Sequence, residues 1–203
     1  MDSVSAVIAI VLALSVGVIS PGPSFIMVAT TALTHGKKAG YAASVGMGLA
    51  GMFYAALASL GLATLIHSNP MLYQALKLFG AAYLAWIAFN QWRHASEPLA
   101  AGKSEISTGS HLWRGTIVQA SNPKTLVVYG SVFAALMPQS PDTWVFFVLP
   151  LTCGIIEWIW YSLVAGVFGN GTTQNTYLRY KTVIDRVAGL IMLALAIRLT
   201  LPL

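Results

Sequence analysis

Long apolar stretches fill most of this 203-residue sequence and leave few charges to cover a water-soluble surface. Charged residues make up 8% of the chain, against about 25% in an ordinary soluble domain. A soluble globule with so little charge would expose large apolar patches, so lipid is the better solvent for this chain. Six stretches are long enough to cross a membrane as helices. They cover residues 4–33, 39–66, 71–92, 112–137, 144–168 and 183–201.

Two of these stretches are interrupted by proline near their middles, at residues 21–23 (Pro-Gly-Pro) and 122–124 (Asn-Pro-Lys). They are the first and the fourth stretch, so each opens a set of three. Because three is odd, the second set crosses the membrane in the opposite direction to the first. Paired interrupted segments in corresponding places point to the binding site of a transporter. We predict an all-α integral membrane protein of six transmembrane helices in two inverted three-helix repeats, residues 1–92 and 112–203, linked by a loop at 93–111.

Positive charge is distributed unevenly between the connections. Those after the first, third and fifth stretches carry eight Lys or Arg, whereas residues 67–70 and 138–142 carry none. Lys and Arg stay in the cytoplasm, so loops 1–2, 3–4 and 5–6 are predicted to be cytoplasmic and the net charge of +5 reflects topology rather than nucleic-acid binding. Both termini then face outward, unless the first stretch re-enters instead of crossing. The acidic start at Asp2 is unlike a signal peptide, so the first stretch is expected to be retained. The eight basic residues are Lys37, Lys38, Arg93, Lys103, Arg114, Arg179, Lys181 and Arg186.

The sequence lacks the residue sets of common intramembrane enzymes and metal sites. Cys153 is the only cysteine, which excludes an intramolecular disulfide and a Cys-x-x-Cys centre. The four histidines fall in loops or at the ends of apolar stretches, and no His-Glu-x-x-His motif occurs. Glu157 is the one carboxylate near the middle of a stretch, so an aspartyl dyad is not available. We expect no enzyme activity, no metal and no cofactor.

The first break predicts a ligand site. Pro21 and Pro23 remove two backbone donors and Gly22 admits unusual conformations, so the helix must kink or unwind there. Unwound backbone in a membrane is tolerated only where protein or a water-filled cavity satisfies it. The half-helix that starts near Ser24 would present free N–H groups and a positive dipole end, which suit the carboxylate that every amino acid carries. A plain packing kink is the alternative.

Near the second break, a lysine at membrane depth needs a partner. Lys124 lies about 15 Å along a helix from Arg114, and an ammonium at the midplane costs at least about 2.5 kcal/mol. Glu157 lies at a similar depth in the fifth stretch and is its natural partner. Lys124 could bind the substrate carboxylate while Glu157 binds the amino group, or Glu157 could carry a coupling proton, or the two could form a static ion pair. The residues that flank Lys124 at the break are Asn122, Pro123 and Thr125.

Three further residues are candidates for the wall of the cavity. Tyr161 shares a helix face with Glu157 at i, i+4, and Trp158 lies deeper in its stretch than most of the other tryptophans. Lys77 either snorkels toward the surface or faces the cavity. Lys181 and Asp185 are spaced to pair at i, i+4, which by itself is a structural detail.

A stripe of small residues in the second stretch allows another helix to approach closely. That helix could belong to the same chain or to a second copy, so a homo-oligomer is left open. The stripe consists of Gly40, Ser44, Gly48, Gly51, Ala55 and Ala58.

Several marked residues recur in a fixed order along the chain, namely Pro21-Gly22-Pro23, Gly36, Gly40, Gly46, Gly48, Gly51, Lys77, Gly80, Ala81, Tyr83, Leu84, Asn122-Pro123-Lys124, Arg186 and Gly189. Their order and spacing resemble the LysE/RhtB family of amino-acid exporters over essentially the whole chain. The fifth span of that family often has Asp before Trp, where this sequence has Glu157-Trp158, a conservative departure. The resemblance implies efflux of small amino acids or their derivatives, coupled to the proton gradient, across a bacterial plasma membrane.

We therefore predict a secondary transporter that exports amino acids by proton antiport and alternating access. A small neutral substrate such as threonine, homoserine or leucine is favoured, because no second midplane carboxylate is available for a cationic side chain. Its expected partners are the amino acid, protons and lipid, without nucleic acid. Three alternatives stay open: an exporter of another small solute, an exporter of a cation, and a passive channel.

Overall fold

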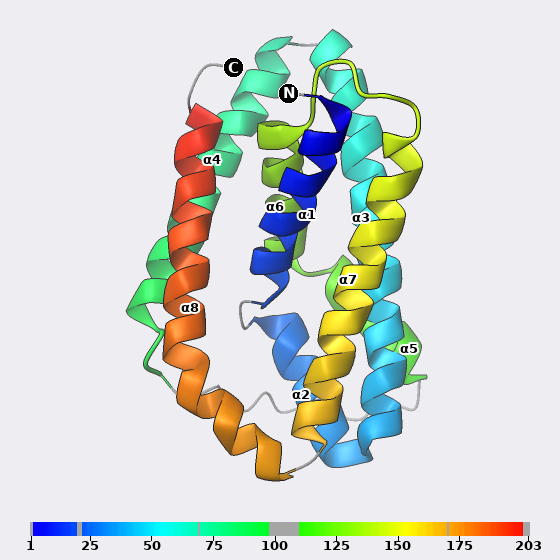
Figure 1. Cartoon of the computed structure of the whole chain (residues 1–203), viewed down its shortest axis with the longest axis vertical. Coiled ribbons are helices and arrows are strands. Elements are labelled where there is room, and N and C mark those ends of the chain that lie inside the picture. Colours follow the sequence, from blue (N-terminus) through cyan, green and yellow to red (C-terminus); the bar gives the residue numbers. More distant parts are fainter. Residues whose placement is uncertain (1, 20–21, 69, 98–109, 170, 201–203) are drawn as a thin grey trace.

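The protein is described by a computed structural model that covers residues 2–19, 22–68, 70–97, 110–169 and 171–200. Within these ranges the chain is helical and contains no strand (Figure 1). The helices are α1 (Ser3–Ile19), α2 (Pro23–His35), α3 (Lys37–Ser68), α4 (Pro70–Arg93), α5 (His111–Ala120), α6 (Pro123–Leu136), α7 (Val145–Phe168) and α8 (Gly171–Thr200).

Both proline breaks are present. The pair α1 and α2 is bent by 56° between Ile19 and Pro23, and α5 ends at Ala120 just before α6 begins at Pro123. Proline is well placed at the first position of α2 and α6, because the N–H it lacks has no partner within a helix there. The breaks predicted in the first and fourth apolar stretches are therefore confirmed.

Several helices are suited to a membrane by length and composition. Residues Lys37–Gly61 of α3, Met71–Arg93 of α4 and all of α7 are each long and apolar enough to cross one, and α1 and α2 reach this together as a bent pair. Helix α6 is apolar but short. The described residues thus support an all-helical membrane protein with three or four such spans, and the six-span arrangement stays a prediction.

The expected start of the last helix was wrong. Hydropathy placed it near Val183, after a loop that carries Arg179 and Lys181, whereas α8 begins at Gly171 and runs unbroken to Thr200. The sequence from residue 171 to residue 182 is mostly polar. A hydropathy pattern finds only the apolar part of a helix, so it missed this start.

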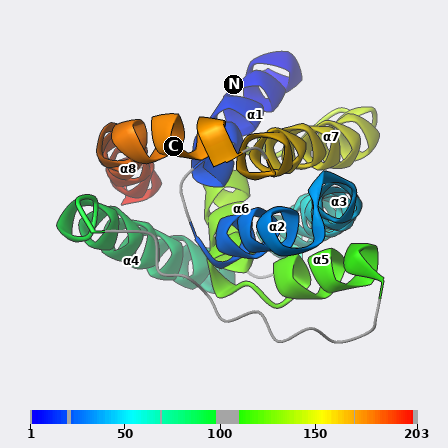
Figure 2. The ribbon, with the colours of Figure 1, turned by 90° about the horizontal axis from the view of Figure 1, so that it is seen from below.

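The helices pack in two groups. Helix α3 contacts α7 and α5, and α4 contacts α8, so that Figure 2 shows α3, α5 and α7 on one side and α4 and α8 on the other. Helices α1, α2 and α6 lie between these groups, and the break after α1 lies near mid-height of the bundle in Figure 1. The two breaks are thereby held inside the helix bundle rather than at its ends.

The small-residue stripe of α3 packs against α7 of the same chain. A Cβ atom on Gly40 would lie 2.7 Å from the Cβ of Ala165, and one on Gly48 would lie 2.7 Å from the carbonyl oxygen of Gly154. Any larger side chain there would push the two helices apart. The stripe therefore serves packing within one chain, and it offers no argument for an oligomer.

Candidate functional site

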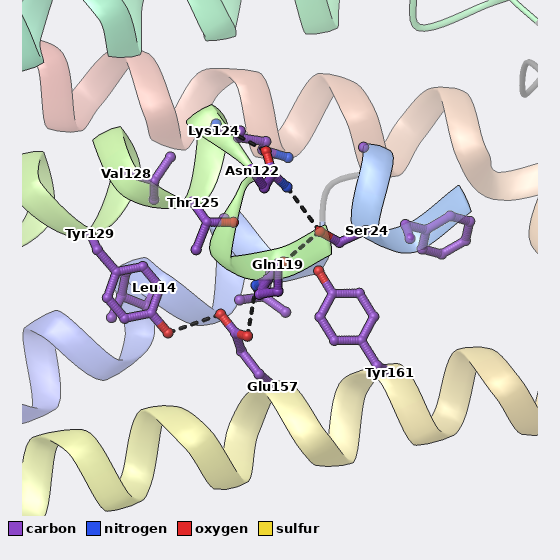
Figure 3. Close-up of a pocket in the computed structure, with 14 residues that line it drawn as sticks. Leu14, Ser24, Gln119, Asn122, Lys124, Thr125, Val128, Tyr129, Glu157 and Tyr161 are labelled. Atoms are coloured by element: carbon purple, nitrogen blue, oxygen red, sulfur yellow. Dashed lines mark hydrogen bonds between the residues drawn. The ribbon is translucent and has the colours of Figure 1, made fainter. Parts of the chain in front are cut away.

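A buried pocket lies where the two breaks meet, and side chains from α1, α2, α5, α6 and α7 line it (Figure 3). One part of its wall is polar and another is apolar. The polar side chains belong to Ser24, Gln119, Asn122, Lys124, Thr125, Tyr129, Glu157 and Tyr161. The remaining lining residues are Leu14, Gly17, Val18, Gly22, Phe25 and Val128.

Glu157 stands at the centre of the polar contacts. Its side chain is buried, with 1% of its surface exposed, and both carboxylate oxygens accept hydrogen bonds. The Gln119 Nε2 donates to Oε2 at 2.7 Å, and the Tyr129 hydroxyl donates to Oε1 at 2.9 Å. Each oxygen keeps capacity for a further donor. The buried carboxyl is thus held in place by two uncharged groups and can still receive a proton or a cationic ligand.

The network continues from Glu157 to both breaks. The Ser24 hydroxyl at the start of α2 donates to Oε1 of Gln119, and the Asn122 Nδ2 before α6 donates to the Ser24 Oγ at 2.8 Å. Ser24, Gln119 and Asn122 are all buried. One chain of hydrogen bonds therefore connects α2, α5, α6 and α7 around the pocket, as Figure 3 shows.

Lys124 and the start of α2 bring positive charge to the same point. The residue before α2 is Gly22, which has no side chain to cap the helix, so the positive end of the helix dipole faces the pocket. A Cβ on Gly22 would lie 3.6 Å from the Nζ of Lys124. Helix α6 differs, because the Asn122 Oδ1 accepts a hydrogen bond from the Lys124 backbone N–H at 3.0 Å and caps it. In Figure 3, Lys124 and Glu157 lie on opposite sides of the pocket.

The structure brings most of the predicted site residues together. Pro23 and Pro123 line a second cavity beside the pocket rather than the pocket itself, and Pro21 lies outside the described residues. The predicted residues that line the pocket are Gly22, Ser24, Asn122, Lys124, Thr125, Glu157 and Tyr161.

Two candidates for the cavity wall lie elsewhere. Trp158 is 47% exposed and is not among the described residues that line the pocket. Lys77 neither snorkels to the surface nor lines the pocket: its side chain is buried, and its Nζ lies 5.8 Å from the centre of the Tyr73 ring one turn earlier on α4. A cation over an aromatic face is favourable, which offsets part of the burial.

The way Glu157 is held was not evident from the sequence. Lys124 was its predicted partner, whereas the hydrogen bonds to its carboxylate come from Gln119 and Tyr129. Tyr129 was not considered, because an aromatic residue in an apolar stretch is usually a packing residue. One signal was available: Asn122, Thr125 and Tyr129 follow the i, i+3, i+7 spacing of one helix face.

Comparison with known sequences identifies the family. The sequence matches the family described as LysE type translocator over residues 15–202. The chain belongs to the LysE type translocator family. It is 30% identical to an uncharacterized membrane protein, YahN, of Escherichia coli (strain K12), over 89% of this chain and 82% of that protein. No solved structure matches it.

Two relatives have names that state a transport activity. The chain is 28% identical to the threonine efflux protein of Escherichia coli (strain K12), over 91% of this chain and 92% of that protein. It is 29% identical to the leucine efflux protein of Klebsiella pneumoniae, over 90% of this chain and 88% of that protein.

Among the described residues, no group of three or more His, Cys, Asp or Glu could hold a metal ion.

Proposed function

We propose that this protein is a secondary transporter of the bacterial plasma membrane that exports a small neutral amino acid from the cytoplasm by proton antiport and alternating access. The observation that carries the proposal is the buried pocket at the two helix breaks, with a basic side and an acidic side. A zwitterion fits such a pocket because each of its charged ends meets the opposite charge. The threonine and leucine efflux proteins named above support amino acids as the substrate class.

The substrate carboxylate is assigned to the basic side. There the start of α2 and the Lys124 ammonium lie next to each other, separated by little more than the backbone of Gly22. Two positive features side by side repel each other and attract an anion between them. A carboxylate at this point would accept hydrogen bonds from the first turn of α2 and from Lys124.

The substrate ammonium is assigned to Glu157. A charge inside a membrane is unfavourable unless it is paired. Without substrate, the Glu157 carboxyl is therefore more stable when it is protonated. With substrate bound, the charged carboxylate is stabilised by the substrate ammonium. Proton and substrate would therefore compete for one group, which is the simplest basis for antiport. The Gln119 and Tyr129 hydrogen bonds keep the carboxyl in one orientation for both partners.

The substrate side chain is assigned to the apolar part of the wall. Leu14, Val18, Phe25 and Val128 would contact a short aliphatic group, and the pocket must widen to admit it, because its free volume of about 20 Å³ holds little more than one water. Glu157 is the one carboxylate among the described residues that line the pocket. A lysine or arginine side chain would lack a second anionic partner there. Threonine, homoserine and leucine are therefore the leading candidates.

Part of the helix packing supports inverted repeats. Helix α3 contacts α7, α4 contacts α8, α1 contacts α6 and α2 contacts α5. These are the contacts expected if residues 1–92 and 112–203 correspond helix by helix about a twofold axis near the breaks. With the basic loops 1–2, 3–4 and 5–6 in the cytoplasm, rocking of one repeat against the other would open the pocket to each side in turn.

The test is amino-acid efflux from bacterial cells that express the protein and are preloaded through dipeptides, with and without a proton uncoupler. We expect release of one or a few neutral amino acids, abolished by the uncoupler and by Glu157→Gln. The matched control is Asp142→Asn, which neutralises an exposed carboxylate in the connection between α6 and α7 and should export normally.

Three results would contradict the proposal in different ways. Release that persists with the uncoupler indicates a passive channel. Selective export of lysine or arginine contradicts the neutral substrate. Wild-type export by Glu157→Gln removes Glu157 from the coupling mechanism.

A further inference from the structure

A second cavity, here called the vestibule, adjoins the pocket and shares Gly22, Asn122 and Lys124 with it. The rest of its wall comes mainly from α4 and α8. It reaches the surface at the end of α4, where the lining residues His94 and Glu97 are exposed. Under the proposed topology this end of α4 faces the cytoplasm, so the vestibule is the route by which a substrate would reach the pocket.

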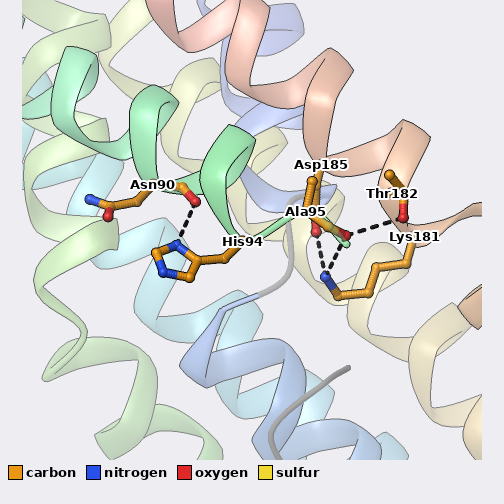
Figure 4. Close-up of polar contacts among 6 residues, drawn as sticks. All are labelled: Asn90, His94, Ala95, Lys181, Thr182 and Asp185. Atoms are coloured by element: carbon orange, nitrogen blue, oxygen red, sulfur yellow. Dashed lines mark hydrogen bonds and ion pairs between the residues drawn. The ribbon is translucent and has the colours of Figure 1, made fainter. Parts of the chain in front are cut away.

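A buried carboxylate lines this route, and one of its oxygens has no hydrogen-bond donor among the described residues. Asp185 of α8 lines the vestibule and is 5% exposed. Its Oδ2 accepts a hydrogen bond from the Lys181 Nζ at 2.7 Å, and the same Nζ donates to the carbonyl oxygen of Ala95 at 3.2 Å (Figure 4). The Oδ1 atom is buried, and no donor within the described parts of the chain reaches it. Lys181 thus fixes the orientation of the carboxylate and leaves one oxygen for another partner.

We propose that Asp185 and Lys124 form a first binding station for the amino acid in the vestibule, with the ammonium on Asp185 and the carboxylate on Lys124. This rests on the proposed function, and it adds a second site to it. A buried acceptor without a donor is unfavourable, and the ammonium of a zwitterion supplies the missing donor together with a compensating charge.

Lys124 links this station to the pocket. It lines both cavities, so the substrate carboxylate can stay with Lys124 while the ammonium moves from Asp185 to Glu157. The amino acid loses its contacts with water gradually along this route. At each step both of its charged groups still have an oppositely charged partner in the protein. The sequence shows only that Lys181 and Asp185 are spaced to pair, because whether the second oxygen of Asp185 has a donor depends on how α4 and α6 pack against α8.

The test is uptake into inside-out membrane vesicles, whose outer face corresponds to the cytoplasm. The probe is whichever of radiolabelled L-threonine, L-homoserine or L-leucine gives the largest efflux from cells. In Asp185→Asn we expect KM to rise about tenfold, the size expected for one lost charge-assisted hydrogen bond, with a maximal rate near that of wild type. Glu157→Gln should instead lose the maximal rate.

Two variants separate the station from a structural ion pair. Lys181→Gln breaks the same ion pair but keeps the carboxylate, with an amide that can still donate to it, so its KM should rise less than that of Asp185→Asn. The exchange variant Lys181→Asp with Asp185→Lys retains an ion pair, which supports folding, but removes the carboxylate from the station, so its KM should rise.

Three results would overturn the station while leaving export itself intact. They are an unchanged KM in Asp185→Asn, an equal rise in Lys181→Gln, and a wild-type KM in the exchange variant. If wild-type vesicles take up none of the three probes, the proposed function is what fails.

Discussion

The two helix breaks meet in one pocket but are built differently. At the second, Asn122 caps α6 through Oδ1 and donates from Nδ2 to Ser24. At the first, the corresponding residue is Gly22, which has no side chain to offer α2. Asn122 therefore caps α6 through its side chain, whereas Gly22 gives α2 no side-chain cap and lies beside Lys124.

This difference indicates a division of roles between two segments with similar sequence signatures. The second break acts as a scaffold, because its cap fixes α6 and so positions Lys124, Thr125 and Tyr129 along the pocket. In the proposed mechanism the first break binds the substrate, because a helix start without a side-chain cap gains most from an anionic ligand. A transporter needs such a group, since a site already satisfied by its own protein gains little by binding substrate.

Gly22→Asp gives the first break the capped form of the second and should have the largest effect. Gly22 has an extended backbone with φ of −164°, which any residue adopts, and a Cβ there meets Lys124 at an ordinary contact distance of 3.6 Å. The new carboxylate would cap α2 and occupy the place proposed for the substrate carboxylate. Efflux should fall to the level of cells without the protein, while the free energy of unfolding in detergent rises by roughly a few tenths of a kcal/mol, the difference between glycine and aspartate at an N-cap.

The matched control for this change is Gly22→Asn, which adds a cap of the same size without a charge. It should raise stability similarly and retain more efflux than Gly22→Asp. Wild-type efflux by Gly22→Asp would show that the substrate carboxylate does not bind at the first break, and the division of roles would then be wrong.

Gly51→Ala tests the group that both breaks hold in place, and a smaller effect is expected. A Cβ on Gly51 would lie 2.6 Å from the Cδ and Oε2 atoms of Glu157, so the carboxyl must shift away from Gln119 or Tyr129. The loss of one such hydrogen bond corresponds to about a tenfold fall in the maximal efflux rate. Gly61→Ala is the control, because it lies on the same helix with no atom within 4 Å. Equal rates for both variants would mean that the position of Glu157 does not matter.

The pocket residues that the sequence singled out are those that stand out locally. Prolines inside apolar stretches marked both breaks, and a lysine and a glutamate at membrane depth marked Lys124 and Glu157 as site residues. Tyr161 followed from its spacing to Glu157 on one helix. Each of these inferences needed only one segment of the chain.

What it could not predict depends on how separate helices pack. Gln119, Tyr129 and Glu157 come from α5, α6 and α7, and their hydrogen bonds exist only once these helices meet. The same holds for Asp185, whose spacing to Lys181 was evident but whose free oxygen was not. Hydropathy likewise placed the apolar part of α8 but not its polar start at Gly171.

The smallest expected effect comes from alanine at the two residues that precede the half-helices, and it measures the difference between the breaks directly. Asn122→Ala removes the cap of α6 and the hydrogen bond to Ser24, so it should lower the free energy of unfolding by at least about 1 kcal/mol, whereas Gly22→Ala removes no side-chain contact and should lower it by about 0.5 kcal/mol, the difference between glycine and alanine at an N-cap. Denaturant unfolding of the two variants in one detergent gives the comparison. Equal losses would mean that the start of α2 is as well satisfied by protein as the start of α6. The substrate carboxylate would then have to be assigned to Lys124 alone.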